Sequence, residues 1–202
     1  MSAVVFQAAG LVLGYPDEKL LSRLDLIEKA VREARAGEQF APAFEFLRSR
    51  PLMDVQSWYV QEFDISRRHA LHLTYWTSGD TRRRGEVIAA IKQVYRESGL
   101  IVDLDGELPD YLPMVLEFTA TGDPARGRRI LTEYRAAIEM LRLSLVHDEL
   151  PYAGVVEAVC DRLGKTTRSI SEQIRTLMAG PPVETVGLGD TLLPYPKVAK
   201  RS

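Results

Sequence analysis

A chain of 202 residues with 46% hydrophobic and 27% charged side chains is typical of a globular protein that buries a substantial core. Its net charge of −2 gives no indication of nucleic acid, a membrane surface or an acidic substrate as partner, and its single cysteine, Cys160, excludes an intrachain disulfide. The first fourteen residues are apolar but too short to span a bilayer, and they lack the features of a secretory signal. We therefore expect a cytoplasmic protein without membrane insertion.

Apolar residues in the first half of the chain repeat with the period of an α-helix. From the amino terminus, the expected helices are one closed by Gly14-Tyr15-Pro16 and others over about 17–37, 39–49, 54–64, 66–78 and 81–98. Pro42 is placed in the first turn of its helix, where a proline is tolerated. An irregular link over residues 99–109 follows.

The second half predicts four more helices. They are a helix capped by Asp110 and apolar nearly all round, the longest helix from Asp123-Pro124, one stopped by Gly164, and a last one before Gly180. No segment alternates with period two, so the fold class is all-α, a single helical bundle over residues 1–180. Residues 181–202 contain prolines and glycines without a helical stripe, and we expect a disordered tail.

The stretch Tyr59–Gly85 combines large aromatic side chains with five arginines around a Gly79-Asp80-Thr81 break. Gly79 suits the left-handed position that ends a helix, and Asp80 or Thr81 can cap the next one. The stretch is therefore interpreted as helix, tight turn, helix.

Several candidate chemistries fail on their spacing. His69 and His72 lie three residues apart on an expected helix, but no further ligand pattern accompanies them, so a metal site is not expected. The acidic run over 103–110 lacks the calcium-loop pattern. Arg82-Arg83-Arg84 with nearby aromatics could bind nucleic acid, but the sequence pI of about 6.0 disfavours that reading. No catalytic motif is present, and we expect no enzymatic activity.

Three ordered motifs resemble those of the nitrate reductase delta subunit family, the NarJ-type molybdenum-enzyme assembly chaperones. The first has the pattern YVxxFDxxRRxxLxLTYxxxGDTRxRG and lies over residues 59–85. The second, ELPDYLPxxLEF, lies over 107–118, and the third, GPPVETVGL, over 180–188. Related chaperones of the wider redox-enzyme maturation group carry Asp-His where this chain has Asp110-Tyr111, so a mechanism that relies on a titrating histidine at that position is not expected here.

The resemblance implies an all-helical chaperone of the redox-enzyme maturation type. It would bind the amino-terminal segment of the nitrate reductase alpha subunit and keep it competent for insertion of bis-molybdopterin guanine dinucleotide before membrane attachment. The cofactor would enter the client and not bind stably to the chaperone, and proteins of molybdenum cofactor biosynthesis would be further partners. The alternative is a regulatory or scaffold subunit that stays bound to a molybdenum oxidoreductase.

Aromatic and arginine side chains are enriched where proteins bind peptides, so we expect a groove for an amphipathic client helix. For each ring the alternative is a place in the core. The expected floor is Phe63, Leu71, Tyr75, Leu112 and Val115, with Tyr59, Trp76 and Tyr111 at the edges. The expected rim carboxylates for basic client residues are Asp64, Asp80, Glu107 and Asp110. The expected supporting residues are Arg67, Gly79, Thr81, Arg84, Pro109 and Pro113, of which the two arginines would orient the carboxylates.

Overall fold

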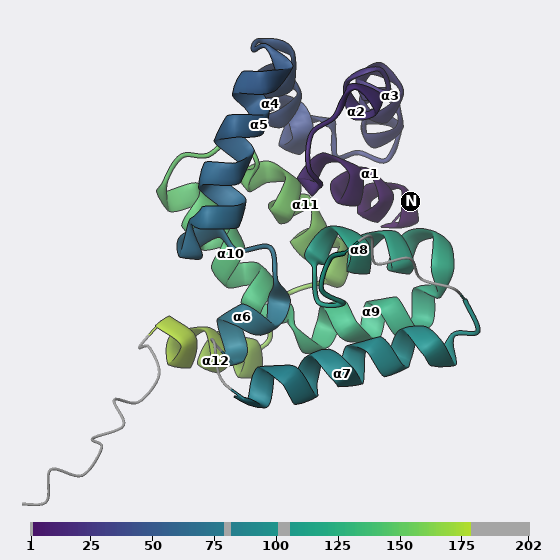
Figure 1. Cartoon of the computed structure of the whole chain (residues 1–202), viewed down its shortest axis with the longest axis vertical. Helices are drawn as coiled ribbons and strands as arrows, with labels where there is room; N and C mark the ends of the chain where they lie inside the picture. Colours follow the sequence, from purple (N-terminus) through teal and green to yellow (C-terminus); the bar gives the residue numbers. More distant parts are fainter. Residues whose placement is uncertain (1, 79–81, 101–105, 179–202) are drawn as a thin grey trace, which may run out of the picture.

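The computed structural model describes residues 2–78, 82–100 and 106–178, which form a bundle of helices (Figure 1). The α-helices are α1 (Ser2–Leu13), α2 (Glu18–Leu21), α3 (Leu24–Glu33), α4 (Gly37–Arg48), α5 (Leu52–Tyr59), α6 (Leu73–Ser78), α7 (Arg82–Glu97), α8 (Leu112–Glu117), α9 (Pro124–Glu133), α10 (Arg135–His147), α11 (Ala153–Leu163) and α12 (Arg168–Met178). They are joined or extended by the π-helices η1 (Val60–Ile65) and η3 (Phe118–Gly122) and the 3₁₀ helix η2 (Arg67–His69).

No β-strand occurs in the described ranges, so the predicted all-α class is confirmed. The expected turn at Gly79-Asp80-Thr81 and the expected tail over 181–202 lie outside the described residues.

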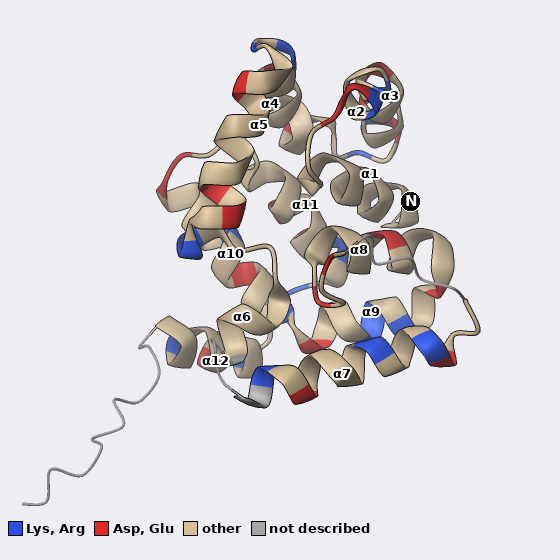
Figure 2. Cartoon of the chain, viewed as in Figure 1, with Lys and Arg blue, Asp and Glu red and all other residues tan. Residues whose placement is uncertain are grey.

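Helix α1 packs against α8 and α11 (Figure 1). It carries no charged residue and is tan throughout in Figure 2, and seven of its twelve residues are buried. A helix that is apolar nearly all round is stable when neighbours cover it. Gly10 allows the close approach, because a Cβ there would lie 3.0 Å from the carbonyl oxygen of Pro113 in α8. The apolar helix expected after Asp110 is α8, which packs on α1.

Two helices expected to be continuous are divided. The segment from Asp17 breaks into α2 and α3 at Ser22-Arg23, and the predicted longest helix breaks at the buried Tyr134, between α9 and α10. A break of one or two residues hardly disturbs a stripe with a period of 3.6, so the sequence pattern revealed neither break. Two expected starts are correct: the Asp17 and Asp123 carboxylates accept from the Leu20 and Arg126 amides at 2.6 and 2.9 Å.

Pro42 is the sixth residue of α4 and not part of its first turn, so that placement was wrong. Helix α4 begins at Gly37, two residues earlier than expected. A proline at the sixth position lacks the amide hydrogen that would bond to the carbonyl four residues before it.

The helix expected over 66–78 is the main error in the secondary structure. Helix α5 runs on as the π-helix η1, and the chain then forms the short 3₁₀ helix η2. It becomes extended at His72, which forms an isolated antiparallel bridge with Tyr111, and α6 begins only at Leu73. His69 and His72 therefore do not share a helix face.

The carboxyl-terminal helices are joined by a buried charged cluster. Arg135 and Glu139 of α10 are each 5% exposed, and the Arg135 Nη2–Glu139 Oε1 distance is 2.6 Å. Arg135 also donates to the Cys160 carbonyl of α11 at 2.6 Å, and Arg142 Nε donates to Glu139 Oε2 at 2.7 Å. Buried charges are tolerated when they are paired and hydrogen-bonded in this way.

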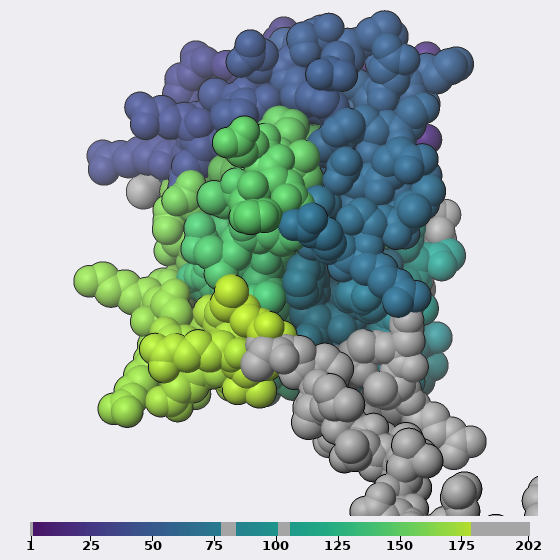
Figure 3. Space-filling view, turned by 90° about the vertical axis from the view of Figure 1, so that its left-hand side faces the viewer, coloured from purple at the N-terminus to yellow at the C-terminus, as the bar shows by residue number. Residues whose placement is uncertain are grey.

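Helix α12 packs on α10 without a fully buried residue. It forms the yellow lower part of the face in Figure 3. On the same face the blue segment around α5 borders the green surface of α10 and α11. Elsewhere acidic and basic residues are interspersed over the surface (Figure 2). None of the helices in the described part of the chain combines the length and hydropathy required to cross a bilayer.

Candidate functional site

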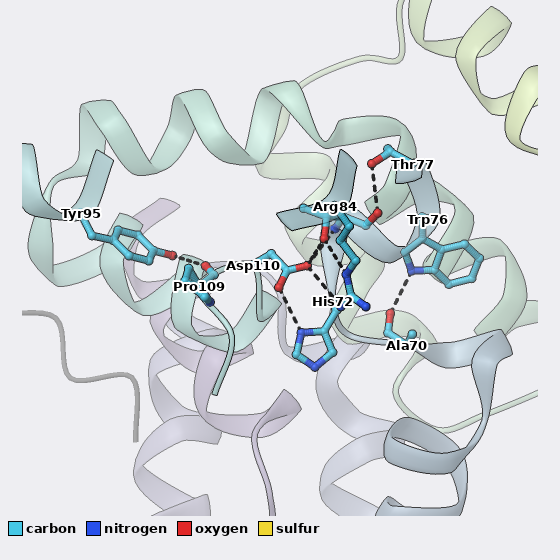
Figure 4. A network of polar contacts seen from close by, with 9 residues as sticks. Ala70, His72, Trp76, Thr77, Arg84, Tyr95, Pro109 and Asp110 are labelled. Atoms are coloured by element: carbon cyan, nitrogen blue, oxygen red, sulfur yellow. Dashed lines mark hydrogen bonds and ion pairs between the residues drawn. The ribbon is translucent and has the colours of Figure 1, made fainter. Parts of the chain in front are cut away.

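The first two sequence motifs meet at one junction in the structure (Figure 4). The Leu112 amide donates to the Leu71 carbonyl at 2.8 Å, and the Leu73 amide donates to the Asp110 carbonyl at 3.0 Å. These two bonds flank the His72–Tyr111 bridge. Residues about forty positions apart in the chain thus form one unit that carries α6 on one side and α8 on the other.

The Asp110 carboxylate is fully buried at this junction. Its Oδ2 accepts hydrogen bonds from the Thr74 amide at 3.0 Å and the Thr74 hydroxyl at 2.5 Å, and its Oδ1 lies 3.3 Å from His72 Nδ1. Burial alone would raise the pKa of Asp110, but the hydrogen bonds from His72 and Thr74 outweigh it and the pKa is lowered. The nearest Arg84 nitrogen is 4.0 Å from Oδ2.

Asp110 was expected to cap its own following helix and to act as a rim carboxylate, and the structure contradicts both expectations. Tyr111 is the residue before α8 and makes no side-chain capping bond. Asp110 instead caps α6, since its backbone and side-chain oxygens take the amides of Leu73 and Thr74. It is an internal positioning residue with no surface for a client.

Polar atoms of the first motif, over residues 59–85, fix it to this junction (Figure 4). Arg84 Nε donates to the Thr74 hydroxyl oxygen at 3.2 Å, and the guanidinium carbon lies 6.0 Å from the centre of the Tyr75 ring. Trp76 Nε1 donates to the Ala70 carbonyl at 2.9 Å. The rings of Tyr75 and Trp76 stay partly exposed.

The second motif is anchored from both sides. The Tyr95 hydroxyl of α7 donates to the Pro109 carbonyl at 2.8 Å. The Tyr111 hydroxyl lies 2.8 Å from the Tyr59 hydroxyl, which in turn donates to the Leu13 carbonyl at 2.9 Å. Burial raises the pKa of Tyr111 to about 12 and also raises that of Tyr59, so both are neutral phenols at physiological pH.

Two hollows lie at the junction. The smaller, with a volume of about 280 Å³, is lined by Phe63, Asp64, Ile65, Ser66, Arg67, Ala70, His72, Tyr75 and Arg84. The larger, of about 720 Å³, includes Tyr111 and Glu107 and extends along α1, α2 and α8. Pockets that enclose small ligands span about 300–1,000 Å³, so the smaller hollow suits a single side chain and the larger one a longer apolar segment.

The residues expected to form a hydrophobic floor are mostly core. The buried residues of the expected site are Tyr59, Phe63, Leu71, Pro109, Asp110, Leu112, Pro113 and Val115. Those partly or fully exposed are Asp64, Arg67, Tyr75, Trp76, Arg84, Glu107 and Tyr111. Buried rings and aliphatic side chains cannot touch a client unless the bundle opens, so the exposed subset forms the candidate surface. Asp80, Gly79 and Thr81 are outside the described residues.

The two arginines expected to orient carboxylates differ in their surroundings. Arg84 lies over Tyr75 and bonds Thr74 next to Asp110, which agrees with a supporting role. Arg67 is exposed on the edge of the smaller hollow, where Asp64 also lies. Burial raises the pKa of the Asp64 carboxyl, although His72 acts in the opposite direction.

The larger hollow includes residues that the sequence reasoning missed. Its wall on and directly after α1 contains Gln7, Gly10, Leu11 and Gly14, of which only Gly14 was given a role, in the turn that closes the helix. The available signal was the pair Gly10 and Gly14, one inside α1 and one directly after its last residue, because neither has a side chain that would fill the space there.

The two histidines lie in separate clusters. His72 lies beside Asp110, whereas His69 is 3% exposed, with its Nε2 2.9 Å from Asp148 and its Nδ1 3.0 Å from Glu62. The His69 cluster ties the segment after α5 to the end of α10. Among the residues that the structure describes, no group of three or more His, Cys, Asp or Glu side chains is placed to hold a metal ion.

Comparison with known proteins agrees with this arrangement. The model of the family described as nitrate reductase delta subunit matches residues 28–156. A Bacillus subtilis protein named probable nitrate reductase molybdenum cofactor assembly chaperone NarJ is 28% identical over 159 residues, which cover 77% of this chain and 86% of that protein. The nitrate reductase-like protein NarX of Mycobacterium tuberculosis is 41% identical over 157 residues, 78% of this chain. The matched region spans only 24% of that protein.

A solved structure shares the fold. The crystal structure of a putative redox enzyme maturation protein from Archaeoglobus fulgidus superposes with a TM-score of 0.61 at 19% identity, covering 81% of this chain and 94% of the other. The two proteins therefore share a helical fold. Since the family model covers more than half of the sequence and its motifs build the junction, the chain belongs to the nitrate reductase delta subunit family.

Proposed function

We propose that this protein is an assembly chaperone for a nitrate reductase and that it binds the amino-terminal segment of the catalytic alpha subunit. The observation that supports the proposal is the junction itself, where the motifs over residues 59–85 and 107–118 are hydrogen-bonded to each other and flanked by two hollows. Relatives of the same family are named as molybdenum cofactor assembly chaperones. In this proposal the chaperone works in the cytoplasm, and the molybdenum cofactor is inserted into the client and does not stay on the chaperone.

Side chains available at the junction suit an amphipathic helix. Tyr75 and Trp76 are both partly exposed. The indole N–H of Trp76 is already bonded to the Ala70 carbonyl, and the Arg84 guanidinium lies near the Tyr75 ring. Asp64 and Glu107 add exposed carboxylates. Helices bind to such surfaces through apolar anchors at positions i, i+3 or i+4, and i+7, with charged residues at the rim.

Calorimetric titration with a synthetic peptide of the first twenty or so residues of the alpha subunit tests this proposal. We expect the parent protein to bind the peptide and not a scrambled peptide of the same composition. Tyr75→Ala should weaken binding at least tenfold, because a buried aromatic anchor contributes about 2 kcal/mol or more. Circular dichroism should show that this variant is folded. Equal affinity of the folded variant and the parent would place the site elsewhere.

A second candidate, a regulatory or scaffold subunit, differs in the state of the client that it accompanies. A chaperone should copurify with the cofactor-free alpha subunit and be absent from the mature membrane enzyme. A scaffold should remain bound to the mature enzyme in stoichiometric amount. Proteins of molybdenum cofactor biosynthesis would join the complex only in the first case.

A further inference from the structure

Apolar, hydrogen-bond-accepting and basic groups are unevenly distributed around the larger hollow. Their positions indicate which side chains of the proposed client would fit there. One wall is the carboxyl-terminal half of α1, and the facing wall is α8 with η3. Its apolar lining includes Leu11, Leu20, Ile27, Met114 and Phe118. Tyr111 lies where this hollow meets the junction.

The hydrogen-bond direction at Tyr111 is fixed by the geometry. The Leu13 carbonyl can only accept, so the Tyr59 hydroxyl must donate its single proton to that bond. The 2.8 Å contact between Tyr59 and Tyr111 then requires Tyr111 to be the donor. The proton of the Tyr111 hydroxyl is thus used in this bond, and its oxygen keeps lone pairs that can only accept a further hydrogen bond.

Other groups around the hollow share this character. Helix α1 ends here with no basic residue in its last turn, so the negative end of its dipole is not neutralised by its own side chains. Gln7 lines the same wall, and its side-chain oxygen is buried without a hydrogen-bond partner among the described residues. Glu107 and Glu117 add exposed carboxylates.

The cations at the hollow lie on a different wall. Lys19 belongs to α2, and Arg23 immediately precedes α3, whereas Asp17 is occupied in capping α2. The acceptors are on α1, at Tyr111 and on both ends of the α8 segment. The hollow is therefore apolar in its middle, with acceptors along the walls formed by α1, Tyr111 and the α8 segment.

From this polarity we propose, on the basis of the proposed function, that the larger hollow binds an amphipathic client helix whose lysine or arginine side chain reaches the Tyr111 oxygen. Apolar residues of the same helix occupy the lining between α1 and α8. A basic side chain supplies several hydrogen-bond donors and a positive charge, which match the free lone pairs, the helix dipole and the two carboxylates. In this proposal the smaller hollow does not contact that basic side chain.

A double-mutant cycle between protein and peptide tests the contact. Calorimetry would compare the parent with Tyr111→Phe, which keeps the ring and leaves the Tyr59–Leu13 bond in place. Each protein would be titrated with the alpha-subunit peptide and with peptides in which one basic residue at a time is replaced by glutamine. Tyr75→Phe is the matched control, because it removes a phenol oxygen at the smaller hollow.

We expect Tyr111→Phe to weaken binding of the unmodified peptide about tenfold, which is the lower end for a hydrogen bond to a charged group. Against the one peptide that lacks the partner residue, the same substitution should change affinity less than twofold. Tyr75→Phe should show no such coupling. Equal losses for every peptide, or coupling at Tyr75 in place of Tyr111, would overturn the proposal while leaving client binding intact.

A second pair of variants keeps the test decisive if Tyr111→Phe folds poorly. Glu107→Gln with Glu117→Gln should weaken binding of the basic peptide in a salt-dependent manner, while Glu86→Gln on α7, away from the hollow, should not. Loss of the coupling on acetylation of the peptide would assign the contact to its free amino terminus and refute the basic side chain. If the peptide does not bind the parent at all, the proposed function fails first and this inference fails with it.

Discussion

Replacement of Asp110 tests the claim that this residue is a structural centre and not a surface contact. Its carboxylate is fully buried and accepts from two donors of Thr74, with His72 as a third neighbour. Asp110→Ala removes the acceptor from three polar groups at once. The Thr74 amide, in the first turn of α6, then has neither an intrahelical partner nor water.

The magnitude follows from the cost of unpaired buried groups. Each donor left without its partner costs about 1–3 kcal/mol, and the losses overlap because all three groups share one site. We therefore expect Asp110→Ala to lower the free energy of unfolding by about 3–5 kcal/mol, comparable with the breaking of a buried ion pair. In Asp110→Asn the amide oxygen can still accept from Thr74, and the amide nitrogen can donate to His72 Nδ1 once that nitrogen carries no proton. The expected loss is about 1–2 kcal/mol.

Urea denaturation at several pH values measures both quantities. Because the folded-state pKa of Asp110 lies below its unfolded value, the charged form stabilises the fold above about pH 4 and this contribution is lost as the pH falls further. The gap between the parent and Asp110→Asn should therefore narrow below about pH 4. Asp54→Asn, at an exposed carboxylate of α5, should stay within about 0.5 kcal/mol of the parent. An Asp110→Ala protein within 1 kcal/mol of the parent would refute the reasoning.

Two further predictions concern packing and reactivity. Gly154→Ala should destabilise the protein by about 1–3 kcal/mol although alanine favours helices, because the added Cβ would overlap the Gln39 carbonyl oxygen and lie 2.9 Å from its carbon. Gly85→Ala in α7, where a Cβ meets nothing within 4 Å, should instead stabilise it by about 0.5–1 kcal/mol; thermal melts that rank the two glycines equally would contradict this. The Cys160 thiol, whose pKa is raised to about 12 mainly by burial, should resist iodoacetamide at pH 8 in the native protein and react after unfolding in urea, and rapid native labelling would contradict it.

The sequence was informative wherever a local rule decides the structure. Apolar stripes located nearly all the helices, and the caps at Asp17 and Asp123 and the stop at Gly164 lie where predicted. These features depend on residues within one turn of each other, so a linear pattern contains them. Breaks such as the one at Tyr134 depend on how α9 and α10 pack on other helices, and a linear pattern does not contain that information.

Asp110 shows the same limit within the site. Its position before an apolar helix matched the rule for a helix cap, and it does cap a helix, but the helix begins 37 residues earlier in the chain. The local rule correctly predicted that Asp110 caps a helix but named the wrong helix. The start of α6 was hidden, because residues 66–78 were expected to form one continuous helix. The junction could be predicted only as the meeting of two motifs, and its hydrogen bonds required the fold.

The dipeptide Asp110-Tyr111 connects the two hollows. Asp110 accepts a hydrogen bond from Thr74 and so fixes the start of α6. Tyr111 lines the larger hollow, and its hydroxyl is hydrogen-bonded to that of Tyr59. An imidazole lies beside that carboxylate, since His72 Nδ1 from the first motif is 3.3 Å from Oδ1, and its ring centre is 5.5 Å from that of Tyr111. A client residue that contacts Tyr111 would therefore bind next to Asp110, the neighbouring residue in the chain, whose carboxylate caps α6. Helix α6 in turn lines the smaller hollow with Tyr75. Each hollow is thus linked by contacts to one of two adjacent residues of the chain.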